Sequence, residues 1–159
     1  MDASRRYQVT NLVIFAVALG HAALTWPLEA TVALFIAGAA FAFVAEAVVV
    51  SIGLLYHALE PKLLGVPVSV VLVWPALVYL CLRVALILVG VGVGAAALAA
   101  LFGTIFDFVT EPYGLAEGVW RYPAHPVSEP RLGGMPWWNT VGWFCLVFSV
   151  AAVPVLVAL

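Results

Sequence analysis

Charged residues are scarce in this chain. Six Lys/Arg and eight Asp/Glu occur among 159 residues, so only 9% of the sequence is charged, against about a quarter in soluble domains. There is no basic stripe, and the formal net charge of −2 argues against nucleic acid as a partner. Hydrophobic residues make up 66% of the sequence and the mean hydropathy is +1.18. The lipid bilayer is the natural solvent for this composition.

Patterns typical of disulfides and metal sites are also missing. Cys81 and Cys145 both lie in apolar runs, which favours two separate thiols over a disulfide. His57 and His125 lie in polar connectors, and neither His-x-x-x-His nor Cys-x-x-Cys occurs. His21 falls in an apolar run, where a hydrogen bond between helices is the usual role. We therefore predict neither a metal site nor a cofactor.

Five apolar segments are long enough to cross a bilayer, which takes about 20 residues per helix. We predict transmembrane helices at residues 9–26, 30–56, 67–86, 89–109 and 137–159. Residues 110–136 hold five prolines and four glycines and are predicted to form a long loop. The predicted fold class is an all-α integral membrane protein, with a single transmembrane domain and no apparent repeat.

The positions of the cations predict how this domain is oriented. Arg5 and Arg6 precede the first span, and the other loop cations are Lys62, Arg121 and Arg131. With five spans, all of them fall on the same side as the N-terminus. We therefore predict a multi-pass protein of the cell membrane with a cytoplasmic N-terminus and a cytoplasmic long loop.

Glu46 is the first candidate for chemistry, because it interrupts an apolar span. It lies about ten residues, or roughly 15 Å, from the predicted end of its helix, which places it near the middle of the membrane. An ionised carboxylate there costs several kcal/mol, so Glu46 must be protonated or partnered. A structural hydrogen bond to a neighbouring helix is the alternative to a functional role.

Asp107 and Glu111 are the second candidates. Their spacing of four residues places both carboxylates on one face of a helix, which is predicted to end near Pro112. Two adjacent carboxylates can share a proton, so that one acts as an acid while the other stays ionised. The alternatives are a solvated helix end, or a Mg²⁺ site for an isoprenoid diphosphate, which normally needs a second acidic cluster. Asn139, just inside the last span, could position a carboxylate or a water.

Several short stretches resemble one family. Matching patterns lie at residues 60–68, 71–79, 106–112, 118–122 and 134–143. In this order they resemble the membrane carotenoid-biosynthesis proteins, which include carotenoid 1′,2′-hydratases acting on γ-carotene or on bisanhydrobacterioruberin. The chain differs in having Glu111-Pro112 where the family usually has Asp-Pro, and family members are commonly longer. Besides Asn139, the candidate substrate-binding residues in the matching stretches are Trp74, Tyr79 and Trp143.

The resemblance implies hydration of the terminal C=C bond of an acyclic carotenoid, without a cofactor. We expect protonated Glu46 to act as the acid, and Asp107 and Glu111 to orient water. The expected partners are the polyene substrate, membrane lipid and other enzymes of carotenoid biosynthesis. One alternative is a non-catalytic carotenoid- or lipid-binding membrane subunit. Another is an isoprenoid transferase that uses Asp107 and Glu111 with Mg²⁺.

Overall fold

The computed structural model describes residues 1–157 and 159. Over these residues the chain forms the helices α1 (Ala3–Thr25), α2 (Leu28–Ser51), α3 (Val68–Val89), α4 (Val93–Ala116) and α5 (Trp137–Val157). Each is long and apolar enough to cross a membrane, which confirms the predicted all-α class. Short strands and one 3-10 helix fill the connections: β1 (Tyr56–His57), β2 (Lys62–Leu63), β3 (Val66–Pro67), β4 (Trp120–Arg121), η1 (Pro126–Ser128), β5 (Arg131–Leu132) and β6 (Met135–Pro136).

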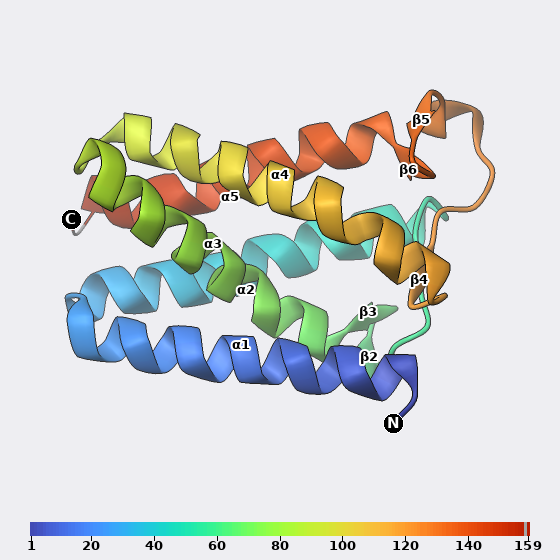
Figure 1. Cartoon of the computed structure of the whole chain (residues 1–159), viewed down its shortest axis with the longest axis horizontal. Coiled ribbons are helices and arrows are strands. Elements are labelled where there is room, and N and C mark those ends of the chain that lie inside the picture. The colour runs from blue at the N-terminus through green and yellow to red at the C-terminus, as the bar shows by residue number, and fades with distance from the viewer. Residues whose placement is uncertain (158) are drawn as a thin grey trace.

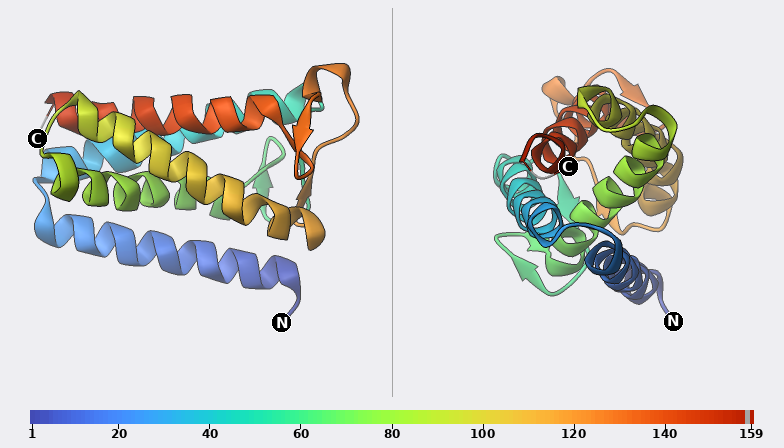
Figure 2. Two further views of the ribbon diagram at one scale, coloured as in Figure 1. Left: turned by 45° about the horizontal axis from the view of Figure 1, so that its top comes forward. Right: turned by 90° about the vertical axis from the view of Figure 1, so that its left-hand side faces the viewer.

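Helices α2 to α5 pack together as a bundle, and α1 lies outside it, mainly against α3 (Figure 1). Figure 2 shows this arrangement from the end, with α1 set apart from the other four helices. All the strands gather at one end of the bundle, beside the N-terminus, while the C-terminus lies at the other end. Both long loops and the first residues therefore share one polar end of the molecule.

Small residues let the helices approach closely. Ala95, Ala96, Ala99 and Ala100 of α4 are fully buried. In α2, a Cβ built on Gly38 would lie 2.9 Å from the Cβ of Pro75 in α3. Since lipid tails are as apolar as leucine, close van der Waals packing of this kind is a principal force between helices in a membrane.

Several helix bounds differ from the sequence prediction, and the ends of α2 and α4 are the ones that bear on the site. Helix α2 ends at Ser51 rather than near residue 56, because the chain turns at Gly53, whose φ of 77° favours glycine. Glu46 is thus five residues, or about 7.5 Å, from the end of its helix and not near mid-membrane. Helix α4 continues through Pro112 to Ala116. Its last turn is closed by hydrogen bonds from the N–H groups of Gly118 and Val119.

The fold contains a repeat that the sequence analysis missed. The order α2–β1–β2–β3–α3 is followed by the same order, α4–β4–β5–β6–α5. Strands β1 and β4 pair with each other across the two units, whereas β2–β3 and β5–β6 are hairpins within them. Each hairpin leads directly into the second helix of its unit. We call residues 28–89 the first half and residues 93–157 the second half.

Aligning the halves shows why the repeat escaped notice. Before the hairpins the shift is 65 positions (46 to 111), and from the hairpins on it is 69 positions (60 to 129), because the second half has a longer loop that holds η1. Identical residues occur at 30/95, 38/103, 41/106, 43/108, 44/109, 46/111, 53/118, 60/129, 61/130, 63/132, 65/134, 67/136, 74/143, 77/146, 78/147 and 84/153. Common apolar residues between these positions hide the pattern.

Candidate functional site

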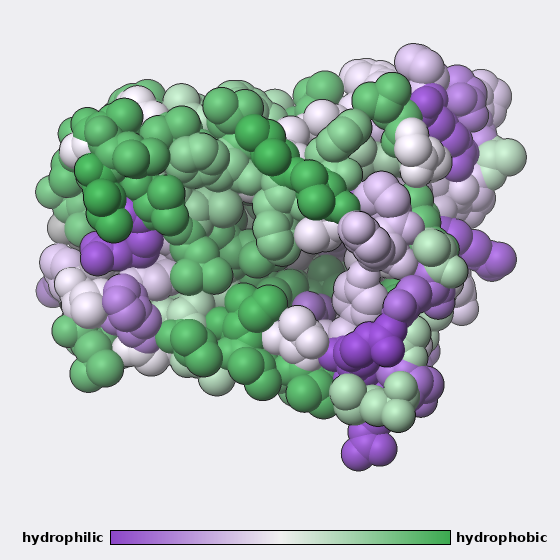
Figure 3. Space-filling view, in the orientation of Figure 1, coloured by the Kyte–Doolittle hydropathy of each residue, from purple (hydrophilic) through white to green (hydrophobic). Residues whose placement is uncertain are grey.

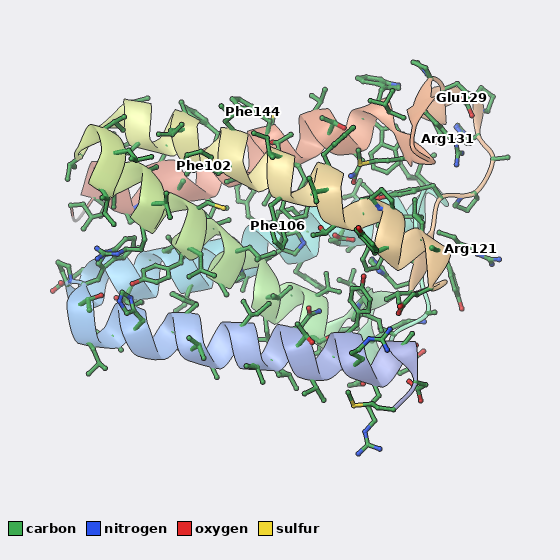
Figure 4. The ribbon with its side chains drawn as sticks, in the orientation of Figure 1. Phe102, Phe106, Arg121, Glu129, Arg131 and Phe144 are labelled. Carbon is green, nitrogen blue, oxygen red and sulfur yellow. The ribbon has the colours of Figure 1, made fainter. Side chains whose placement is uncertain are left out.

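A cavity of about 430 Å³ lies near the polar end and is lined by residues of all five helices and of the loops. Six of the seven predicted site residues line it: Glu46, Trp74, Asp107, Glu111, Asn139 and Trp143. Figure 3 shows a hollow between α1 and α4, with apolar surface on one side and hydrophilic residues toward the polar end. Phe106, on α4 beside this gap, is labelled in Figure 4. The cavity thus joins lipid-facing surface to buried acidic groups.

Glu46 is held by two nitrogen donors. One carboxylate oxygen, Oε2, lies 2.9 Å from Nε2 of His57, and the other accepts a bond from the indole of Trp74 at 3.3 Å. His57 comes from β1, which follows the turn at Gly53. Only 14% of the Glu46 side chain is exposed. Both oxygens therefore have partners, which removes much of the cost of placing a carboxylate here.

Glu111 occupies the equivalent position in the second half and is held in a parallel way. Its Oε1 accepts bonds from Trp120 at 2.7 Å and from the hydroxyl of Tyr122. Burial raises the pKa of Tyr122 well above its usual value, and the nearby Glu111 carboxylate raises it further. Tyr122 consequently stays protonated and remains a donor. Each of these donors, His57 and Tyr122, lies eleven residues after its glutamate.

Asp107 is the most distinctive group in the cavity. It is 3% exposed, and its Oδ2 accepts a bond from the side-chain amide of Asn139 at 2.9 Å. Glu111 lies one helical turn farther along α4 and lines the same cavity. The expected pairing on one helix face is therefore present. The first half has Ala42 at the position of Asp107 and Val70 at that of Asn139.

Two aromatic rings form a further wall. Trp74 and Trp143 stack with centroids 4.0 Å apart and an angle of 28° between their planes. They occupy equivalent positions in the two halves, so they pair where the halves meet. Because the faces of aromatic rings carry negative charge, such a wall attracts a positive charge that develops nearby.

Tyr79 does not line this cavity, so the structure separates it from the other six candidates. It is fully buried, and its hydroxyl lies 2.6 Å from Nδ1 of His21. Trp26 packs edge-on against its ring. Its place on α3 is more than one helical turn beyond Trp74, away from the polar end. The geometry gives Tyr79 a role in fastening α1 to α3, and His21 makes the predicted bond between helices.

Several residues of the site were not predicted from the sequence. His57, Trp120 and Tyr122 were not chosen, although the last two lie in a stretch that resembles the family. Helix α1 adds Tyr7 and Asn11 to the lining. The spacing of eleven residues between each glutamate and its donor could have indicated both His57 and Tyr122, but only after the two halves had been aligned.

Charged residues surround the outer end of the cavity. Arg6 of α1 forms an ion pair with Glu117, just beyond α4. Farther out, Arg131 forms an ion pair with Glu129 on the last loop, and Arg121 lies apart from them on β4 (Figure 4). No group of three His, Cys, Asp or Glu side chains within residues 1–157 or at 159 is arranged to hold a metal ion. The exposed ion pairs at this end, such as Arg6–Glu117, each contribute at most about 1 kcal/mol to the stability of the fold.

The five membrane-length helices of residues 1–157, packed around a cavity with acidic groups, are typical of a multi-span membrane protein. The family model for carotenoid biosynthesis proteins matches residues 7–158. The chain therefore belongs to the carotenoid biosynthesis protein family, which supports a role in carotenoid biosynthesis and implies a carotenoid substrate. No curated protein and no solved structure matches the chain.

Proposed function

We propose that this protein adds water to the terminal C=C bond of an acyclic carotenoid end group. The observation that carries the proposal is the pairing of Asp107 with Glu111 at a cavity that also contains Glu46 and an apolar side open to lipid. Hydration needs an acid that carries a proton beside the alkene and a base that orients water. The cavity supplies carboxyl groups for both tasks.

Asp107 is the better candidate for the acid. Two buried carboxyl groups close together on one helix face share a proton more readily than they carry two charges, and Glu111 already accepts bonds from Trp120 and Tyr122. We therefore assign the proton to Asp107. The amide of Asn139 fixes one Asp107 oxygen and leaves the other for the proton.

Glu46 then takes the role of base, which reverses the assignment made from the sequence. That assignment rested on a mid-membrane depth, whereas Glu46 lies one and a half turns from its helix end and accepts bonds from two N–H donors. Its place near the polar end also brings it closer to water.

The reaction balances without an electron carrier. Asp107 gives its proton to the less substituted alkene carbon, and the electron pair of the C=C bond forms the new C–H bond. A tertiary carbocation remains, next to the faces of Trp74 and Trp143. Water bonds to this carbon, and Glu46 accepts the proton that is released. Proton exchange with solvent at the polar end restores both groups.

The polyene needs an apolar route out of the cavity. The gap between α1 and α4 provides one, with Ile14 and Phe106 among the residues that line the cavity. A carotenoid end that enters here would leave the rest of its chain in the hydrocarbon of the bilayer. This fits a ligand site that is mostly apolar and has a few fixed polar groups.

The proposal can be tested in a carotenoid-producing host that lacks its own hydratase. Mass spectrometry of the pigments should show one added water per modified end with the natural chain and none with Asp107→Asn. Glu29→Gln, an exposed carboxyl at the start of α2, is the matched control and should behave as the natural chain. Unchanged pigments from well-folded natural protein, supplied with both lycopene-type and C50 substrates, would reject hydration.

One observation favours a second function, that of a carotenoid-binding membrane subunit without catalysis. Glu46 and Glu111 both bond to a residue eleven positions later, so each could serve simply to anchor the loop that follows it. In that case the Asp107→Asn variant should still bind pigment and still support product formation by its partner enzyme. Activity that disappears with a Mg²⁺ chelator would instead indicate transferase chemistry.

A further inference from the structure

Helix α1 has one apolar face and one face that carries polar side chains. Val9 and Val13 are exposed on the outer face, as suits a helix that meets lipid. Tyr7, Asn11 and Ile14 follow one another at helical spacing on the opposite face, and all three line the main cavity. Helix α1 therefore directs Asn11 toward the cavity and away from lipid.

Asn11 differs from the other side-chain amides of the chain, which are those of Gln8 and Asn139. The amide of Gln8 donates to the carbonyl of Glu60, and that of Asn139 donates to Asp107 at 2.9 Å. Asn11 is half-buried, and its amide bonds to no other group of residues 1–157 and 159. Because an amide within a membrane span is costly unless it is bonded, the partner of Asn11 should come from what the cavity binds.

Asn11 lies at a depth similar to that of Asp107. Helix α1 begins and helix α4 ends at the polar end of the molecule (Figure 1). At about 1.5 Å per residue, Asn11 is about 12 Å along α1 from Ala3, and Asp107 is about 13.5 Å along α4 from Ala116. An end group that enters between α1 and α4 and reaches Asp107 therefore also comes close to Asn11.

The chemistry of the amide indicates what it binds. A side-chain amide offers two N–H donors and one carbonyl acceptor, so it suits a neutral group that both accepts and donates a hydrogen bond, such as a hydroxyl. A polyene hydrocarbon has no such group. Hydration supplies one, because the oxygen of the added water becomes the tertiary hydroxyl of the end group.

We propose that Asn11 binds this oxygen, first as water and then as the tertiary hydroxyl of the hydrated end group. The residue then determines specificity, because it distinguishes an end group that carries a hydroxyl from a plain hydrocarbon end. The ligand class of the cavity is thus an acyclic carotenoid with a tertiary alcohol at the end that enters. The origin of the oxygen from water rests on the proposed hydration, whereas the preference for a hydroxylated end does not.

A competition between two pigments that cannot be hydrated tests the proposal. Both are acyclic carotenoids with a saturated terminal bond, and only one of them carries a tertiary hydroxyl at that end. The natural chain in lipid nanodiscs should retain the hydroxylated pigment with about 2- to 10-fold preference over protein-free nanodiscs, which is the range of one net hydrogen bond. Chromatography and absorbance give the ratio of the retained pigments. Equal retention of the two pigments by the natural chain would overturn the proposal.

Two substitutions on α1 assign the preference to a residue. Asn11→Leu nearly keeps the size of the side chain but removes its hydrogen bonds. This variant should retain the hydrocarbon pigment as the natural chain does, which shows that it folds, and should lose the preference for the hydroxyl. Gln8→Leu is the matched control, because it removes an amide of the same helix that does not line the cavity; it should keep the preference. A preference that survives Asn11→Leu would contradict the role of Asn11.

The outcome of this competition is separate from the outcome for hydration, because binding is measured without turnover. A preference that depends on Asn11, in a chain that adds no water to pigments in the producing host, would support the hydroxyl site and reject hydration. Water addition by a chain that shows no preference would support hydration and reject the hydroxyl site.

Discussion

The two halves of this protein share a backbone plan but differ in chemistry. Both place a glutamate about one and a half turns before the end of the first helix, and both satisfy it with a donor eleven residues later. Only the second half adds Asp107 and its partner Asn139, where the first half has Ala42 and Val70. Both halves therefore hold a glutamate in the same way, whereas Asp107, the group proposed as the acid, occurs in the second half alone.

The two halves also differ in which of their helices is covered by α1, and this difference is just as informative. Helix α1 lies over the first-half helix α3 and encloses the main cavity, whereas the equivalent face of α5 is bare. A symmetric pair of units therefore becomes an asymmetric molecule through one added helix and one added acid. The predictions that follow test this contrast between the halves.

The largest expected effect is on Asp107. Asp107→Asn should lower product formation by about 10² to 10⁴-fold, the range typical of a lost general acid. Ala42→Ser, at the equivalent position of the first half, should have little effect, because no acid acts there. Carotenoid products are quantified by mass spectrometry against the protein present in the membrane. Equal activity of Asp107→Asn and the natural chain would remove the chemical distinction between the halves.

The next effect concerns packing at the end of α4. A Cβ on Gly114 would lie 2.1 Å from the ring of Trp120. Gly114→Ala should therefore displace the tryptophan and reduce stability by about 1–3 kcal/mol, as overpacking usually does. Gly142→Ala, at an open site on α5, is the control. Thermal unfolding in detergent measures both variants, and equal unfolding temperatures would contradict the packing at Gly114.

Smaller effects are expected from the two donors. Tyr122→Phe and His57→Phe each remove one hydrogen bond to a glutamate, which should cost about 0.5–1.5 kcal/mol of unfolding free energy. His57→Tyr places the second-half donor in the first half and should restore part of the loss. If His57→Tyr were no more stable than His57→Phe, the two donors would not be equivalent.

The smallest effect is the pH dependence that comes from Tyr122. The folded chain raises the pKa of this phenol above the usual value of 10.0, because the group is buried beside Glu111. The unfolded chain therefore loses the proton first, and stability falls as the pH rises through 10. The loss should be about 0.4 kcal/mol at pH 10, where half of the unfolded chains would be ionised. Tyr122→Phe should remove this slope, and an unchanged slope would assign it to another group.

Much of the fold could be predicted because hydropathy over about 20 residues is a strong signal. The five spans follow from composition alone, and the short motifs led to the family that the match over residues 7–158 confirms. The ends of the helices were predicted less accurately. Helix α2 ends early because the chain turns at Gly53. Helix α4 continues beyond Pro112, and there Trp120 contacts Glu111 and Gly114. Such contacts come from residues on other segments, which local sequence does not reveal.

The candidate site was predictable in part. Charged and amide residues within apolar sequence indicated Glu46, Asp107, Glu111 and Asn139, because burying such groups is costly unless they have partners. Tyr79 was grouped with them because it lies in a stretch that resembles the family, but its place on α3 directs it toward α1 instead. His57 and Tyr122 were missed because their glutamates lie on helices, whereas His57 lies on β1 and Tyr122 directly follows β4.

The sequence by itself determined that this chain spans a membrane and which groups are costly to bury there, since both depend on residue type and local spacing. Only the tertiary structure decided which acids share a cavity, which donors hold them, and that the chain consists of two equivalent halves. These properties depend on pairings between residues far apart in the chain, such as β1 with β4 and Trp74 with Trp143. Pairings of this kind leave no local pattern in a sequence where most residues are apolar.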